Sequence, residues 1–128
     1  RTAAGVDVAH ILSDLALANL EERHPATLSG GQKQRLAVAA CVAADKRVLV
    51  FDEPTSGLDL DGMRRIARLL RELAGQGRAV LVVTHDLELV ACACDRALCV
   101  EGGTICASAA VAEQFDLVKE LMGVPMPQ

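Results

Sequence analysis

Two short apolar runs, each closed by polar residues, constrain the fold of this chain more than any other feature. "RVLVFDEP" (47–54) ends in two carboxylates and a proline, and "AVLVVTHD" (79–86) ends in a threonine, a histidine and an aspartate. Apolar runs of this length without polar alternation are typical of strands buried on both faces of a parallel sheet. We therefore expect two strands that end at a common carboxyl edge, where open α/β sheets gather their ligand chemistry.

Helical patterns alternate with these strands. Apolar residues recur at the spacing of a helical face, and glycines at 75 or 77 are expected to stop the helix between the two strands. Near the end of the chain, "RALCV" and "TICAS" flank the turn "EGG" and predict a hairpin. The alternation predicts an α/β chain with a mainly parallel sheet and flanking helices. The helices are expected at about Val6–Leu17, 29–43, 63–73, Asp86–Cys94 and Ala109–Met122.

Composition limits the class of protein and its partners. With 128 residues, 52% hydrophobic and 23% charged, the chain is expected to form one domain, or part of one, around one core. A net charge of −4 argues against nucleic acid as a partner, because such a partner needs a basic field. No apolar stretch approaches the roughly 20 residues of a membrane-spanning helix, and no signal-peptide pattern is present, so a cytosolic location is expected.

The five cysteines do not form a recognisable metal or disulfide pattern. They stand at 41, 92, 94, 99 and 106, an odd number without a C-x-x-C pair. Neither a disulfide framework nor a zinc site is indicated by this spacing. We expect them to be small, buried, apolar side chains.

The stretch "LSGGQ" (28–32) combines glycines with the start of a helix. Ser29 fits the N-cap position and Gln32 fits position N3 of a capping box. Gly30 and Gly31 leave the backbone N–H groups uncovered, and the helix dipole favours an anion at this end. The alternative is an ordinary helix N-cap that contains glycines and binds no ligand. The motif G-x-x-x-x-G-K-[ST], which usually supplies a phosphate-binding lysine, does not occur in the sequence.

Four segments taken together resemble a known family. They are "LSGGQ" (28–32), "VLVFDE" (48–53), "SGLD" (56–59) and "THD" (84–86). In this order and spacing they closely resemble the C-terminal half of an ATP-binding-cassette (ABC) ATPase domain, over about residues 4–108. The resemblance implies a partial P-loop NTPase fold that lacks the N-terminal phosphate-loop half. It assigns about 1–45 to a signature and helical part, about 46–108 to the core, and about 109–128 to a C-terminal helix and tail.

The resemblance gives roles to the polar residues at the strand ends. Asp52 is matched to the Walker B aspartate, which holds Mg²⁺ through water, and Glu53 to the catalytic base that orients water toward the γ-phosphate of ATP. His85 resembles the family's switch histidine, whose imidazole contacts the same phosphate. Taken alone, each of these residues also fits an ordinary structural role. Asp52 and Glu53 could simply cap a strand end, and His85 could be a solvated loop residue.

The resemblance also implies that the chain works with a second ATPase domain. In this family two domains pack head to tail, and the signature loop binds the γ-phosphate of ATP held by the opposite domain. Ser29, Gly30, Gly31 and Gln32 are the matching residues, and Asp59 matches the segment that crosses the same interface. The phosphate that "LSGGQ" binds is therefore expected to belong to a partner.

The family's phosphate loop, its adenine-stacking aromatic residue and its glutamine-bearing loop would all precede Arg1. We therefore expect a truncated or split version of a longer polypeptide, and an isolated chain that does not hydrolyse ATP at a useful rate. The missing strand is expected to leave apolar sheet edges unpaired.

The function implied is that of an ATPase subunit, or a fragment of one, in an ABC-type membrane importer that couples ATP hydrolysis to solute uptake. "THDLELVACACDRALCVEGGTICASA" and the ending "LMGVPMPQ" resemble the energy-coupling-factor group. That group implies integral membrane subunits as partners and a cytoplasmic position, peripheral on the inner face of the cell membrane. Two alternatives remain open: a soluble ABC ATPase acting in DNA repair or on ribosomes, and a non-catalytic remnant that only completes a partner's site.

Overall fold

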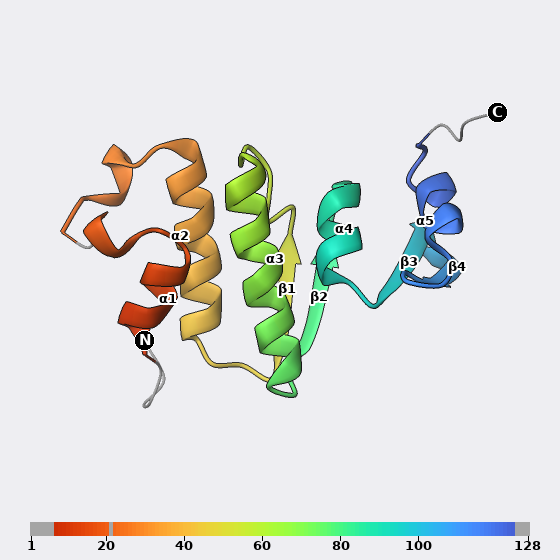
Figure 1. The fold of residues 1–128 in the computed structure, drawn as a ribbon, viewed down its shortest axis with the longest axis horizontal. Coiled ribbons are helices and arrows are strands. Elements are labelled where there is room, and N and C mark those ends of the chain that lie inside the picture. The colour runs from red at the N-terminus through yellow and green to blue at the C-terminus, as the bar shows by residue number, and fades with distance from the viewer. Residues whose placement is uncertain (1–6, 21, 125–128) are drawn as a thin grey trace. The chain divides into compact units, whose positions relative to one another are not determined.

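A computed structural model describes residues 7–20 and 22–124 of the chain, which divides into two compact units, residues 1–84 and 85–128 (Figure 1). The predicted helix start at Val6 and the sequence ending at 125–128 lie outside the described residues. The first unit contains α1 (Val8–Asp14), short 3₁₀ turns at Ala18–Leu20 and Pro25–Thr27, α2 (Gly30–Ala43), β1 (Val48–Asp52), α3 (Leu60–Gly75) and β2 (Ala79–Val83). The second contains α4 (Leu87–Ala93), β3 (Arg96–Glu101), β4 (Thr104–Ala110) and α5 (Phe115–Leu121).

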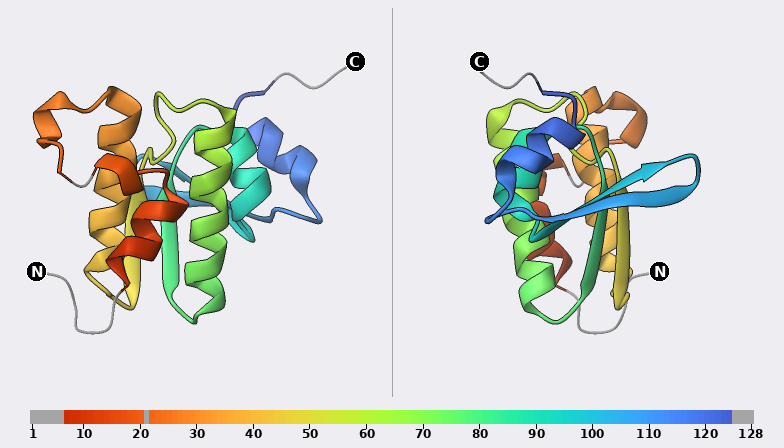
Figure 2. Two further views of the ribbon diagram at one scale, coloured as in Figure 1. Left: turned by 60° about the vertical axis from the view of Figure 1, so that its left-hand side comes forward. Right: turned by 90° about the vertical axis from the view of Figure 1, so that its right-hand side faces the viewer.

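The first unit is built on one parallel strand pair. β1 and β2 run side by side from the pairing of Val48 with Ala79 to that of Asp52 with Val83. The right-hand view of Figure 2 shows α3 on one side of the two strands. The apolar stripe predicted for α3 is confirmed, because Met63, Ile66, Ala67, Leu70 and Leu73 are all buried. The helix ends at Gly75, and Gly77 turns the chain with a φ of +82° that favours glycine. The predicted α/β class is therefore confirmed.

The two strands are buried on one face only. Leu49 and Phe51 are 2% and 5% exposed, whereas Val48 and Val50, which point to the other face, are each 59% exposed. Leu81 and Val83 on β2 are also more than half exposed, at 51% and 58%. The expectation of strands buried on both faces is therefore wrong for this chain, because its helices α2 and α3 contact the strands and leave one face uncovered.

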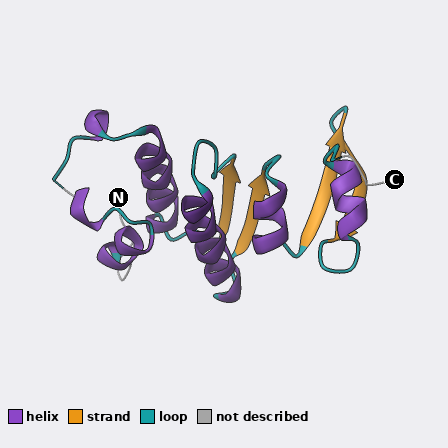
Figure 3. Cartoon of the chain, turned by 45° about the horizontal axis from the view of Figure 1, so that its top comes forward, coloured by secondary structure: helices purple, strands orange, loops and turns teal. Residues whose placement is uncertain are grey.

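The second unit is an antiparallel hairpin with two helices. β3 and β4 pair from Arg96 opposite Ala110 to Glu101 opposite Thr104. Gly102 and Gly103 form the two-residue turn with φ of 56° and 77°, which is the conformation that hairpin turns require. Figure 3 shows α5 beside this hairpin. The predicted hairpin is confirmed, and the described strands form one parallel and one antiparallel pair rather than one mainly parallel sheet.

Two predicted helix boundaries are wrong. α1 ends at Asp14 instead of about Leu17, because Ala16 has a φ of 54° that no helix residue adopts. The last helix begins at Phe115 instead of Ala109, because Ala109 pairs with Ala97 in the hairpin. Val118 of α5 instead forms a buried core with Val90 of α4, Ala109 of β4 and Val111. Among the described residues, no helix has both the length and the apolar character that a bilayer crossing requires.

One-sided burial of the strands predicts unequal costs for the same substitution. We expect Leu49→Ala on β1 to lower the free energy of unfolding by about 2–5 kcal/mol, because it empties a packed position. The matched change Leu81→Ala on the neighbouring strand, at a half-exposed position, should cost roughly 1 kcal/mol or less. Urea unfolding followed by far-ultraviolet circular dichroism compares the two variants. Equal losses would contradict one-sided burial.

Candidate functional site

The signature segment forms the start of α2. Ser29 is the N-cap, and its Oγ accepts from the backbone N–H of Gln32 at 3.2 Å, while Gln32 Oε1 accepts from the N–H of Ser29 at 2.9 Å. Both bonds of the predicted capping box are therefore present. Leu28 is 8% exposed and anchors the segment, whereas Ser29 and Gly30 are exposed. The start of this helix is thus fixed in shape and open to solvent.

The two glycines of the segment have different surroundings. A Cβ added at Gly31 would lie 3.2 Å from Leu58 Cδ2 and 3.8 Å from the carbonyl oxygen of Gly57. A Cβ added at Gly30 would have no atom within 4 Å. Gly31 therefore allows α2 to approach the loop that precedes Asp59, and Gly30 leaves the outer side of the helix start uncovered. The structure brings "LSGGQ" and "SGLD" together, as neighbours in one unit.

Arg35, one turn into α2, adds a positive charge to this region. Its Nη1 lies 3.8 Å from the Cβ position at Gly31. Its Nε is buried and has no hydrogen-bond partner within the described part of the chain. A buried guanidinium N–H without a partner is costly.

Glu53 is held at the tip of β1 by bonds from β2 and α2. Its N–H donates to the carbonyl of Val83 at 2.8 Å, and Thr84 Oγ1 donates to its carboxylate Oε2 at 3.3 Å. Gln34 Nε2 donates to its carbonyl oxygen at 3.0 Å. Its φ of 47° lies in the left-handed region that side-chain-bearing residues rarely adopt, and such strain clusters at functional sites. Asp52, the last residue of β1, is exposed.

The loop after Glu53 leads to Asp59 through a tight turn. Pro54 and Thr55 are buried, and the N–H of Ser56 donates to the carbonyl of Glu53 at 3.1 Å. Asp59 is the N-cap of α3, and its Oδ1 accepts from the N–H of Gly62 at 2.8 Å. The carboxylate of Asp59 therefore has a local structural role, in addition to the interface role that the resemblance implies.

His85 belongs to the second unit. It follows Thr84 directly in the chain, and its side chain is exposed. The next residue, Asp86, is the N-cap of α4 and accepts from the N–H of Leu89 at 3.1 Å. The structure thus places one set of predicted site residues, from Ser29 to Asp59, in the first unit, and His85 at the start of the other.

A cavity of about 300 Å³ in the first unit lies away from these residues. Asp45 and Arg78, which precede β1 and β2, are among its lining residues, and Arg78 donates to Asp45 at 2.6 Å. The cavity is therefore near the beginnings of the strands, at the opposite end from Asp52 and Glu53. None of the predicted site residues lines it.

The cysteines differ from their prediction. None is buried: Cys92 and Cys106 are exposed and the other three are partly exposed. Burial raises the pKa of Cys41. A side-chain hydrogen bond with Cys106, partial burial and the nearby charges of Cys106 and Glu101 raise the pKa of Cys99. Cys99 and Cys106 meet across the hairpin, a contact that was not predicted although their positions on either side of "EGG" indicate it.

Comparison with known proteins identifies relatives of the chain. A family profile described as "AAA domain, putative AbiEii toxin, Type IV TA system" matches residues 11–91. A "Putative ABC transporter ATP-binding protein" of Treponema denticola is 52% identical, over 74% of this chain and 19% of that protein. The energy-coupling factor transporter ATP-binding protein EcfA2 of Methanospirillum hungatei is 44% identical, over 84% of this chain and 27% of that protein. The methionine import ATP-binding protein MetN of Salmonella enteritidis is 40% identical, over 84% and 35% respectively.

A solved structure has the same fold. The archaeal ribosome recycling factor aABCE1, in complex with the ribosomal stalk protein aP1, superposes with a TM-score of 0.79 at 29% identity, over 90% of this chain and 23% of that chain. The chain spans less than half of the length of each of these proteins. Together with the motifs on α2 and at the strand tips, these matches show that the chain belongs to the AAA/ABC ATPase domain family.

Proposed function

We propose that the chain is part of the ATP-binding, ATP-hydrolysing subunit of an ABC-type membrane importer. The observation that carries this proposal is the position of Glu53, held at the tip of β1 by Val83, Thr84 and Gln34, in the same unit as the exposed start of α2. The names of the relatives support the importer part, because two of them are a methionine import protein and an energy-coupling factor protein.

In this proposal Glu53 is the general base of ATP hydrolysis. A base must hold one orientation to accept a proton from an attacking water, and the bond from Thr84 Oγ1 orients the Glu53 carboxylate. The adjacent Asp52 is exposed and offers carboxylate oxygens, the ligand type that Mg²⁺ prefers. Asp52 would hold Mg²⁺ through water, and Mg²⁺ would neutralise charge on the phosphates of ATP. His85 would contact the γ-phosphate through its imidazole ring.

The signature segment would act on ATP bound by a second ATPase domain. The open N–H groups at Gly30 and the dipole of α2 favour an anion. The capping box engages the Ser29 and Gln32 side chains, so it fixes the direction of these N–H groups in advance. Arg35 supplies positive charge beside Gly31. Asp59, next to this segment, would lie at the same boundary between the two domains.

Partners and location follow from the same proposal. The chain would pack head to tail with a second ABC ATPase domain, bind integral membrane subunits, and lie in the cytoplasm against the inner face of the membrane. ATP would be its substrate and Mg²⁺ its cofactor. The energy-coupling-factor group is the subgroup we propose, supported by the 44% identity to EcfA2.

The alternative of a soluble ABC ATPase acting on ribosomes has one observation in its favour. The chain superposes on the archaeal ribosome recycling factor aABCE1 with a TM-score of 0.79. The identity there is 29%, whereas the Treponema relative, described as a transporter protein, is 52% identical. We therefore favour transport, and purification of the tagged protein from cells would distinguish the two. Membrane subunits in the eluate support transport, and ribosomal proteins in their place would overturn it.

Two inactive variants test whether the site is shared between two subunits. We design a chimera in which this chain replaces the matching segment of MetN. Glu53→Gln removes the base and should lower ATP turnover by roughly 100- to 10,000-fold. Gly30→Asp places a negative charge at the open helix start and should also abolish turnover. Mixing the two inactive variants should restore turnover, to roughly a quarter of the chimera's rate for random pairing, because one site in each mixed dimer is intact.

The control for Gly30→Asp is Gly75→Asp, at another helical glycine whose added Cβ would meet no atom within 4 Å. This variant should keep the turnover of the unmodified chimera. Absence of any recovery on mixing, with both variants dimeric by light scattering, would show that Gly30 and Glu53 serve the same subunit's nucleotide.

A further prediction concerns the divalent cation. Asp52→Asn should raise the Mg²⁺ concentration needed for half-maximal ATP turnover of the chimera by about 10- to 100-fold, as expected for a residue that holds a metal through its water ligands. Asp95→Asn, at an exposed aspartate in the second unit, is the matched control and should leave the Mg²⁺ titration unchanged. An unchanged titration for Asp52→Asn would remove this residue from the Mg²⁺ site.

A further inference from the structure

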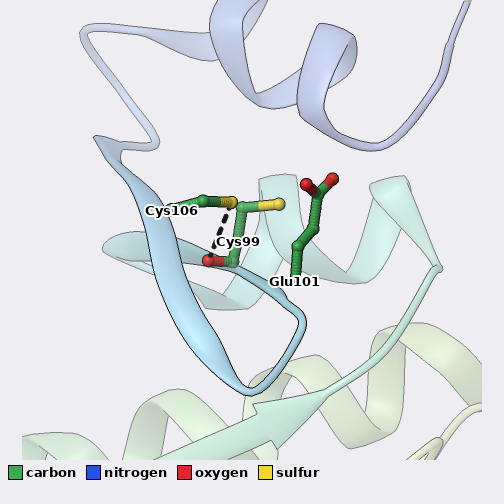
Figure 4. A group of neighbouring side chains, drawn as sticks. All are labelled: Cys99, Glu101 and Cys106. Atoms are coloured by element: carbon green, nitrogen blue, oxygen red, sulfur yellow. Dashed lines mark hydrogen bonds between the residues drawn. The ribbon is translucent and has the colours of Figure 1, made fainter.

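The β3–β4 hairpin brings two thiols and a carboxylate together on one surface. The Sγ atoms of Cys99 and Cys106 and a carboxylate oxygen of Glu101 all lie within 4.8 Å of one another. Figure 4 shows the three side chains side by side, with the Cys106 thiol directed at Cys99. Cys106 Sγ donates to the carbonyl oxygen of Cys99 at 3.4 Å. The group lies wholly within the second unit and contains none of the residues assigned to ATP chemistry.

A β-bulge explains how the three residues share one face. In a regular strand Cys99 and Glu101 point to the same face, because they are two residues apart. Cys99 pairs with Ala107, but Val100 pairs with Ile105, so Cys106 is an extra residue in β4. A bulge redirects a side chain, and this one turns Cys106 toward Cys99 instead of the opposite face. Regular pairing would have separated the two thiols.

The composition and spacing of the group suit a soft divalent cation. Zn²⁺ binds thiolate sulfur at about 2.3 Å and carboxylate oxygen at about 2.0–2.2 Å, so its tetrahedral ligand atoms lie roughly 3.4–3.8 Å apart. The three ligand atoms already lie within 4.8 Å of one another, and side-chain rotation is the movement that would bring them to that spacing. Thiolates select thiophilic metals such as Zn²⁺ over Mg²⁺ and Ca²⁺, which prefer oxygen ligands.

Access to the group is open. Cys106 and Glu101 are exposed and Cys99 is partly exposed. A cation can therefore reach the thiols from solvent and keep a fourth position for water or another ligand. The turn residues Gly102 and Gly103 join the two strands, so Cys99 and Glu101 on β3 and Cys106 on β4 belong to the same hairpin.

We propose that the β3–β4 hairpin is a binding site for one thiophilic divalent cation, with Zn²⁺ as its expected occupant. Cys99 and Cys106 supply thiolate sulfur, Glu101 supplies a carboxylate oxygen, and water completes a tetrahedral set. The site shares no residue with the magnesium position proposed at Asp52. Its test does not depend on whether the importer proposal is correct.

The test uses the reduced 128-residue chain with Zn²⁺ and Co²⁺ as probes. Competition with a chromophoric chelator should give one Zn²⁺ per chain, and Co²⁺ should produce the sulfur-to-metal charge-transfer absorption that thiolate ligands cause. Cys99→Ser and Cys106→Ser should each weaken Zn²⁺ binding by at least about tenfold and reduce the Co²⁺ band. Cys92→Ser, at an exposed cysteine on α4, is the matched control and should retain both signals.

Glu101→Gln keeps the size of the side chain and removes its charge. It should weaken Zn²⁺ binding while leaving the charge-transfer band, because both sulfur ligands remain. Circular dichroism of each variant confirms that the hairpin is folded. Failure of the reduced chain to bind Zn²⁺, or equal binding by the Cys99→Ser/Cys106→Ser double variant, would overturn the proposal. The proposal would also be overturned if Zn²⁺ bound only between two chains, with Cys106 of each chain as a ligand of the same ion.

Discussion

The hydrogen bonds around Glu53 connect the main parts of the first unit. Glu53 accepts a bond from Gln34 of α2, donates its N–H to Val83 of β2, and directly follows the last residue of β1. These bonds hold Glu53 in a left-handed conformation that would otherwise be unfavourable. The tips of both strands and the signature helix therefore share hydrogen bonds with this one residue. The proposed chemistry therefore depends on backbone geometry as much as on the carboxylate.

The start of α2 and the loop before Asp59 illustrate how two motifs become one surface. The capping box satisfies the side chains of Ser29 and Gln32 locally, so these residues do not need a ligand to hold their conformation. Gly31 allows Leu58 to approach, and Gly30 remains open. The two adjacent glycines thus serve different purposes: one permits packing inside the unit, and the other leaves room for a group from outside it.

The hairpin of the second unit has an arrangement unrelated to these motifs. Its thiol pair arises from a bulge that adds one residue to β4, and the same hairpin packs its Ala109 against the core of Val90, Val111 and Val118. One end of the hairpin is thus buried and the other carries polar and sulfur-bearing side chains in solvent. A local cation site at the exposed end would stabilise the bulge without changing that core.

The sequence by itself determined the elements and the motifs. Apolar spacing predicted α3 and both strands of the first unit, "EGG" predicted the hairpin, and Ser29 with Gln32 predicted the helix cap, because each depends on neighbours a few residues away. Four short segments in one order also sufficed to indicate the ABC family.

Only the tertiary structure decided how these parts meet. An apolar run such as "VLVF" is the same whether one or two faces are covered, so the exposure of Val48 and Val50 depended on what packs around the strands. The end of α1 depended on the left-handed turn at Ala16, and the start of α5 on the length of β4. Bonds between residues far apart in the chain placed Gln34 on Glu53, and an extra residue in a strand placed Cys106 beside Cys99. Such contacts depend on register and packing, which local spacing does not encode.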